Sequence, residues 1–146
     1  MIAIHIAIGS LAILFTLLAF LWGAAAWYRR RPSPWFWKLL RTGQGLVMLE
    51  AVSGTVGIVA GHQASDLHYI YGSVPLFLAV IAEQLKISAA QLILDKRGIA
   101  STAEVGELPP DEQRRLVVTI LRREIGVMTL ACLVTAVLLA RAAMVH

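Results

Sequence analysis

Four long apolar stretches, separated by charged or polar connections, constrain this chain more than any other feature. The first runs from Met1 to Tyr28 without a charged residue, and the others cover roughly residues 39–61, 67–94 and 125–140. A helix that crosses a membrane needs about 20 consecutive, mostly apolar residues. The 146 residues therefore allow four crossings and leave little sequence for a separate soluble domain.

The composition favours the same class. Charged residues make up 15% of the chain, whereas soluble domains usually carry about 25%. The first stretch has no basic residue before Arg29 and is too long for a cleavable signal peptide, so we expect a retained helix. With Cys132 as its single cysteine, the chain has no intramolecular disulfide and no cysteine pair for zinc or redox chemistry. We predict an all-α fold, with one transmembrane domain over residues 1–146 and helices at about 2–28, 36–62, 67–96 and 111–145.

The basic residues predict an orientation. Five lie between the first two stretches and six between the last two, and the connection at residues 62–66 has none. These eleven residues are Arg29, Arg30, Arg31, Lys38, Arg41, Lys96, Arg97, Arg114, Arg115, Arg122 and Arg123. By the positive-inside rule, both basic connections face the cytoplasm. We therefore expect an integral membrane four-helix bundle, up-down-up-down, with the N and C termini outside. The protein is expected to be a multi-pass protein of the cell inner membrane, and the net charge of +4 reports this topology rather than a nucleic-acid partner.

Small residues recur at alternating spacings of three and four in the predicted helices. Each series forms one helix face, and small residues let membrane helices approach closely. The series are His5, Gly9, Ala12, Thr16, Ala19 and Gly23; Glu50, Gly54, Gly57 and Gly61; and His68, Gly72, Pro75, Ala79, Ala82 and Lys86. We expect these faces to form the seams of the bundle.

Two of the series begin with a histidine that is followed four residues later by a glycine: His5 with Gly9, and His68 with Gly72. In the predicted topology both helices run inward, so both histidines lie near the outer rim. Imidazole ligates haem iron and other transition metals, and the interiors of four-helix bundles often hold such cofactors. Glycine one turn away leaves room for a flat macrocycle. The pattern predicts bis-histidine haem b, with His5 and His68 as axial ligands and Gly9 and Gly72 beside them.

Two alternatives remain open for these histidines. Both can be solvated residues at the level of the lipid headgroups. His62, at the outer end of the second helix, can also join His5, His68 and Asp66 in a copper or zinc site, although the spacing of these residues matches no strong metal motif.

Four helices with outer histidines on two parallel members resemble one half of a haem A synthase. They are also similar to four-helix b-type cytochromes with two histidine ligands, to small copper-resistance membrane domains and to other small four-helix bacterial membrane proteins. The segment from Gln44 to Gly61, followed by His62 and a new helix, is the part most similar to the synthase half. The chain has only one such half and lacks the further carboxylate and histidine motifs of the enzyme. The resemblance therefore implies haem binding and not synthase activity.

Ionisable residues at membrane depth are a second candidate site. Glu50 lies eleven residues before Gly61, and Glu83 lies fifteen after His68, with Lys86 one turn further on. At about 1.5 Å per residue, both glutamates are well inside the hydrocarbon, where an ionisable group marks a candidate functional site. Glu50 can pair with Lys86 or Glu83 and lock the bundle, relay protons or contact a quinone or haem edge, or face a partner subunit.

The leading hypothesis is therefore a haem-binding membrane protein associated with electron transfer. The alternatives are a non-catalytic accessory subunit, as a homo-oligomer or in a larger membrane complex, and a small transporter that uses Glu50, Glu83 and Lys86. Phosphate loops, nucleophile elbows and zinc-protease helices are absent, so enzymatic activity and catalytic residues are left open.

Overall fold

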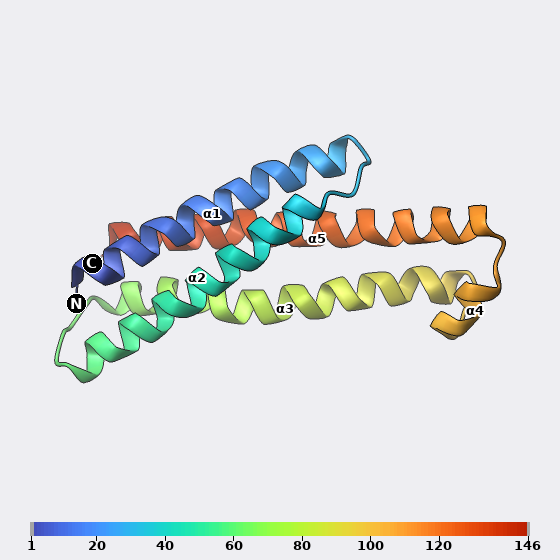
Figure 1. The fold of residues 1–146 in the computed structure, drawn as a ribbon. Coiled ribbons are helices and arrows are strands. Elements are labelled where there is room, and N and C mark those ends of the chain that lie inside the picture. Colours follow the sequence, from blue (N-terminus) through green and yellow to red (C-terminus); the bar gives the residue numbers. More distant parts are fainter. Residues whose placement is uncertain (1, 146) are drawn as a thin grey trace.

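The computed structural model describes residues 2–145, which are almost entirely helical and contain no strand (Figure 1). The helices are α1 (Ile2–Tyr28), α2 (Pro34–Val59), α3 (Asp66–Lys96), α4 (Thr102–Glu107) and α5 (Pro110–Met144). All except α4 are long and apolar enough to cross a membrane. The structure thus confirms the all-α class and the four candidate spans.

Local sequence signals set the helix boundaries. Pro34 stands in the first turn of α2, where its missing N–H costs nothing. At the other end, α2 stops at Val59, three residues before the expected end, because Gly61 takes a left-handed conformation with φ of 85°. Ser65 begins α3 by accepting a hydrogen bond from the backbone N–H of His68. Gly61 therefore lies outside the helix on whose face we expected it.

A short helix lies between the third and fourth predicted helices, in a stretch where no helix was predicted. Ser101 accepts a hydrogen bond from the backbone N–H of Glu104, and the Glu104 carboxylate in turn accepts one from the backbone N–H of Ala100. This arrangement is close to a capping box, which stabilises the first turn of a helix. As a result, α4 forms between the two longest helices.

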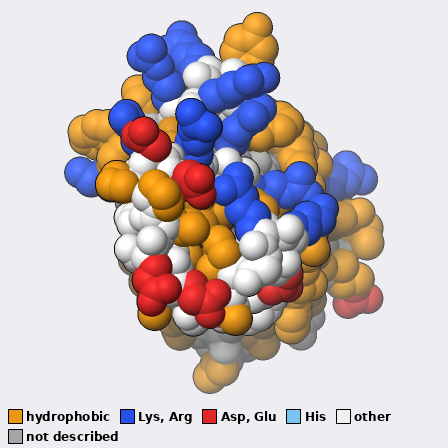
Figure 2. Space-filling view, turned by 90° about the vertical axis from the view of Figure 1, so that its right-hand side faces the viewer, with side chains coloured by type: hydrophobic (Ala, Val, Ile, Leu, Met, Phe, Trp, Pro, Cys, Tyr) orange, Lys and Arg blue, Asp and Glu red, His pale blue; other side chains and the backbone are white. Residues whose placement is uncertain are grey.

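By their contacts, the long helices follow one another in the order α2, α1, α5, α3. Close contacts join α1 to α2, α1 to α5 and α3 to α5, whereas α2 and α3 touch at few points. Both termini and the loop at residues 60–65 lie at one end of the bundle, called here the histidine end. The loop at residues 29–33 and α4 lie at the other end, called here the basic end, where Lys and Arg side chains gather above most of the acidic ones (Figure 2).

Members of the predicted small-residue faces of α1 and α3 lie in the seams, whereas none of the residues predicted for α2 is among its buried residues. On α1, the buried residues are Ala12, Thr16, Ala19, Gly23 and Ala26. On α3, the most buried residues are Pro75 and Ala82, which belong to the predicted series. Small side chains let the backbones approach closely, which is how helices associate when lipid removes the hydrophobic driving force.

Larger side chains complete two apolar clusters. One lies toward the basic end and includes Phe36, Leu40, Ile125, Met128 and Cys132. The other lies toward the histidine end and is built from Ala12, Val47 and Leu139. Cys132, which is buried in the first cluster, is thus a packing residue. Many large apolar residues on the outer faces are exposed, as a surface that contacts lipid would require.

Candidate functional site

The structure brings together the two histidines that the sequence analysis selected. His5 lies in the second turn of α1 and His68 in the first turn of α3, and their ring centroids are 5.9 Å apart with an interplanar angle of 56°. The two residues are 63 positions apart in the chain, on helices that hardly touch. The meeting of their rings is therefore a product of the tertiary arrangement at the histidine end.

Side chains of α2 hold the His5 ring by both nitrogens. Its Nδ1 lies 2.9 Å from the Ser53 hydroxyl oxygen, and its Nε2 lies 3.1 Å from Glu50 Oε1. Ser53 itself donates to the backbone carbonyl of Glu50 at 2.9 Å. Glu50 and Ser53 lie on neighbouring turns of one helix, so α2 contributes a compact polar patch to the site.

The His68 ring is anchored differently. Its Nδ1 lies 3.0 Å from the backbone carbonyl of Ala142, in the last turns of α5. In the described part of the chain, no group forms a hydrogen bond with its Nε2. This is the pattern seen in many metal-ligating histidines, where one ring nitrogen donates to a carbonyl and leaves the other available as a ligand.

The two glycines of the repeated motif have different surroundings. A Cβ atom at Gly9 would lie only 2.7 Å from Glu50 Oε1, so the Glu50 carboxylate occupies the space beside Gly9. A Cβ atom at Gly72 would have no such neighbour within 4 Å. The room that a flat cofactor needs beside its ligand is therefore present at Gly72, whereas at Gly9 it depends on movement of Glu50.

The remaining metal candidates are more scattered. His62 is exposed in the loop between α2 and α3, and Asp66 is exposed at the start of α3. Among residues 2–145, no three His, Cys, Asp or Glu side chains lie close enough together to form a metal-binding group. The structure therefore places His5 next to His68 on one side and next to Glu50 on the other, and among the residues described no hydrogen bond, ion pair or ring contact joins His62 or Asp66 to them.

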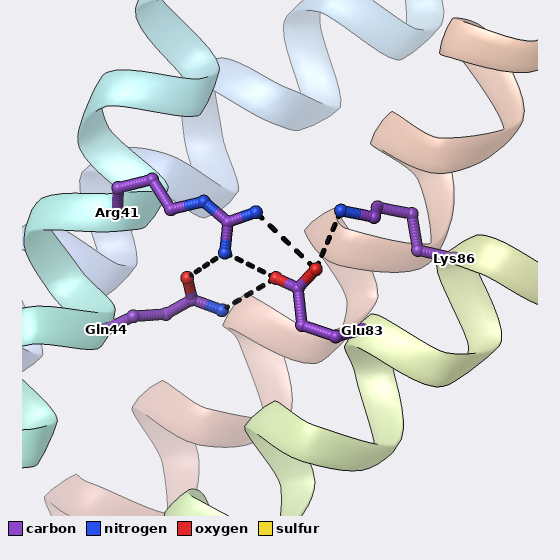
Figure 3. A network of polar contacts seen from close by, with 4 residues as sticks. All are labelled: Arg41, Gln44, Glu83 and Lys86. Atoms are coloured by element: carbon purple, nitrogen blue, oxygen red, sulfur yellow. Dashed lines mark hydrogen bonds and ion pairs between the residues drawn. The ribbon is translucent and has the colours of Figure 1, made fainter.

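A second polar cluster joins α2 to α3 nearer the basic end (Figure 3). The Glu83 carboxylate lies between two cations: Arg41 forms an ion pair with its Oε1, and Lys86 Nζ is 2.7 Å from its Oε2. Gln44 accepts a hydrogen bond from Arg41 at 2.7 Å and donates one to Glu83 at 3.3 Å. Lys86 also lies 5.5 Å from the centroid of the Trp37 ring, within the range of a cation–π contact. The negative charge of the Glu83 carboxylate is therefore balanced by two neighbouring cations.

The expected pairing of Glu50 with Lys86 or Glu83 is wrong. Glu50 contacts His5 on α1, and the partners of Glu83 and Lys86 are each other and Arg41. Arg41, assigned from sequence to a cytoplasmic connection, lies inside α2. Arg41 and Gln44 are three residues apart, so a sequence reader could have expected both side chains to reach one acid on a neighbouring helix. The spacing does not identify which helix carries that acid.

Glu50 stands out among the polar groups of the described region. Its side chain is 17% exposed, and its Oε2 is buried with no hydrogen-bond partner. An unpartnered buried oxygen is costly to maintain. Arg122 Nε and Thr129 Oγ1 are likewise buried without a partner, but Glu50 Oε2 is the atom of this kind that lies beside the histidine pair.

Several uncharged polar residues lie on the outside of α3. Gln84, Ser88 and Gln91 are exposed, and Gln91 donates to Asp95 at 2.8 Å. A partner subunit over this face stays a prediction.

Comparison of the chain with protein-family models, with curated proteins and with solved structures gives no significant match.

Proposed function

We propose that the protein is a multi-pass membrane protein that binds haem b between His5 and His68 and takes part in electron transfer near the outer face of the cell membrane. The observation that supports this most directly is the meeting of the two imidazole rings with centroids 5.9 Å apart. Two imidazoles this close together, from helices α1 and α3, are the residues that would hold the haem iron.

The surroundings of the rings add support. His68 is oriented by a backbone carbonyl with its Nε2 available, and the space beside Gly72 is open. Ligation through His5 Nε2 requires the Glu50 carboxylate to give up its contact with that nitrogen. Bound haem would supply one-electron chemistry, while the protein holds the two imidazoles and Glu50 places a carboxylate at the edge of the site.

The test is the visible spectrum of the protein purified from cells supplied with a haem precursor. Haem ligated by two histidines gives a strong Soret band that shifts on reduction. His5→Ala and His68→Ala should each lose the band, because each removes one axial ligand. His62→Ala is the matched control: it removes an imidazole from the same end of the molecule without touching the pair, and it should keep the spectrum.

A colourless wild-type protein that also contains no metal by elemental analysis would overturn the proposal. A spectrum that survives in both His5→Ala and His68→Ala would do so as well, because the haem would then be held elsewhere.

A second candidate, a small proton- or ion-coupled transporter, is favoured by the unpartnered Oε2 of Glu50 beside His5. A membrane-embedded acid next to an imidazole can accept and release a proton. In reconstituted vesicles, Glu50→Gln should abolish proton uptake if this candidate is correct. Glu107→Gln, an exposed change in α4, is the control. An unchanged proton flux in Glu50→Gln removes this candidate.

The proposed orientation, with the basic end in the cytoplasm and both termini outside, rests on the positive-inside rule. It is supported by the gathering of the basic side chains at one end of the bundle (Figure 2).

A further inference from the structure

We propose that the basic end holds an anionic phospholipid, with its headgroup at Arg29 and Arg31 and an acyl chain along the outer face of α1 and α2. Two adjoining hollows of about 690 and 410 Å3 lie on this side of the molecule. Both are lined by Trp22 and Ala25, so they adjoin at these two residues and are together called the depression here. This site is far from the histidines and does not depend on the function proposed for them.

The two parts of the depression differ in chemistry. The larger part is lined by Trp22, Ala25, Ala26, Arg29, Arg31, Pro32, Ser33 and Pro34, and is therefore cationic on one side. The smaller part is lined by Leu18, Leu21, Trp22, Ala25, Trp35 and Leu39, all of which are apolar or aromatic. A cationic compartment that opens into an apolar one matches a molecule with an anionic head and a hydrocarbon tail.

The charge on the cationic side is not compensated by the protein. Residues 29–41 contain no Asp or Glu. Arg29 and Arg31 are exposed, and neither takes part in any ion pair found in the described chain. Arg41, by contrast, is already paired with Glu83. The two arginines therefore have their full charge available for a phosphate, and basic pockets beside membrane helices are recurrent sites for anionic headgroups.

The length of the depression fits one leaflet of a bilayer. Arg29 and Leu18 are eleven residues apart at the end of α1, which corresponds to about 16 Å along a helix. Half of a hydrocarbon core of about 30 Å is about 15 Å. A lipid whose headgroup lies at the arginines can thus extend its acyl chain along the depression as far as Leu18.

The wall between the two compartments is fixed in position. Trp22 Nε1 donates a hydrogen bond of 2.9 Å to the Ser33 hydroxyl, and this bond ties α1 to the start of α2. Lys38 lies over the Trp35 ring, 4.6 Å from its centroid. Tryptophan side chains held at this level are typical of the interface between headgroups and hydrocarbon, so the cationic compartment lies where lipid phosphates are.

The test measures lipid retention by native mass spectrometry of detergent-solubilised protein, where orientation in a membrane plays no part. Dioleoyl phosphatidylglycerol and dioleoyl phosphatidylcholine are titrated separately. The wild-type protein should retain phosphatidylglycerol in preference to phosphatidylcholine. The double variant R29Q/R31Q should bind phosphatidylglycerol roughly ten- to thirtyfold more weakly, the loss expected for two cations at a headgroup.

Two further variants separate this site from general attraction. K96Q/R97Q removes the same charge from another exposed part of the basic end and should bind phosphatidylglycerol as the wild type does. Ala25→Phe fills the depression while both arginines stay, so it should weaken binding even if R29Q/R31Q fails to fold. Excess glycerol 3-phosphate should displace nothing, because it lacks the acyl chain.

Three results would overturn the proposal. The first is equal retention of the two lipids by the wild-type protein. The second is an equal loss of phosphatidylglycerol in R29Q/R31Q and K96Q/R97Q, which would indicate an unspecific charge effect. The third is displacement by glycerol 3-phosphate, which would identify a soluble anion as the ligand.

Discussion

Gly23 lies where α1, α2 and α5 meet, and it shows how finely single residues control the packing of this bundle. A Cβ atom there would collide with the Thr129 hydroxyl on α5 and would come within 2.6 Å of the Phe36 ring on α2. Neither neighbour can yield easily, because both side chains are buried. At Gly9, by contrast, the neighbour is the tip of a Glu50 side chain, which can rotate away.

Gly23→Ala should therefore destabilise the protein by about 1–3 kcal/mol, the usual cost of overpacking a well-packed core. Gly45→Ala is the control, because a Cβ atom at this helical position meets nothing within 4 Å. It should leave stability unchanged or raise it by up to about 1 kcal/mol through helix propensity. Unfolding of both variants in mixed detergent micelles, followed by circular dichroism, measures the difference. A Gly23→Ala variant as stable as Gly45→Ala would contradict the packing described.

The helical periodicity of the sequence predicts some side-chain contacts and misses others. It placed His5 and His68 on inward faces, and their rings meet in the structure. It could not identify Ser53 as the partner of His5. It also could not identify the backbone carbonyl of Ala142 as the partner of His68. Every helix residue has a carbonyl, and tertiary packing determines which one the ring reaches.

At the scale of elements, α2 and α3 are held together mainly by side-chain chemistry. The two helices touch at few points, yet Glu83 on α3 contacts both Arg41 and Gln44 on α2 (Figure 3). The ion pair is only partly shielded from its surroundings, because the Arg41 side chain is 52% exposed.

A double-mutant cycle tests this link between the helices. Glu83→Gln and Arg41→Gln should each destabilise the protein, and the pair should show a coupling energy of about 1–2 kcal/mol, as expected for groups in direct contact. The control cycle combines Glu83→Gln with Lys38→Gln. Lys38 lies one turn before Arg41 on α2 and stacks on Trp35 instead of contacting Glu83. That cycle should show no coupling. Equal coupling energies in the two cycles would mean that the coupling comes from long-range electrostatic attraction and not from the direct contact between Arg41 and Glu83.

α5 is too long for one crossing. Its 35 residues correspond to about 52 Å, whereas the hydrocarbon is about 30 Å thick. Trp27, near the end of α1, lies against Gly126. Tryptophan is enriched at membrane interfaces, so we expect the membrane boundary near this residue of α5. The preceding turns of α5, which contain four arginines, then project beyond the bilayer.

This geometry predicts which parts of α5 react with a water-soluble reagent. In a Cys132→Ala background, Val117→Cys should react with a charged maleimide in proteoliposomes made permeable on both sides, because it lies about 13 Å beyond Gly126. Val137→Cys should not react, although both valines are exposed on the helix surface. Mass spectrometry of the labelled protein measures the extent of reaction. Similar reactivity at the two positions would contradict the placement of the membrane.

At the scale of the whole molecule, the two ends of the bundle differ in chemistry. The histidine end has both termini, the imidazole pair and a short loop without Lys or Arg. The basic end has most of the cations and the depression lined by Arg29 and Arg31. Such an asymmetry is what the positive-inside rule describes.

The orientation can be tested in spheroplasts with two single-cysteine variants in the Cys132→Ala background. Gln63→Cys, in the loop at residues 60–65, should react with a membrane-impermeant maleimide from outside. Gly106→Cys, in α4, should react only after permeabilisation. Both positions are exposed, so access to the reagent is the only difference expected. The reverse pattern would place the histidine end in the cytoplasm.

The sequence by itself determined the helices and the faces by which they pack. Length and apolarity dictate four spans, because an unpaired backbone is too costly in lipid. The alternation of small residues predicts the inward faces of α1 and α3. These are local properties, so they can be predicted from neighbouring residues alone. The end of α2 at Val59 was not predicted, because the periodicity does not reveal the left-handed conformation of Gly61.

Only the tertiary structure decided which helix each inward face meets. The periodicity of α2 placed Glu50 inward but did not reveal that α1 with His5, and not α3 with Lys86, would lie opposite. Helices of similar length and apolarity can be arranged around each other in several orders that bury much the same small residues. The order found here, α2, α1, α5 and α3, follows from close contacts such as those at Gly23, which link residues far apart in the chain.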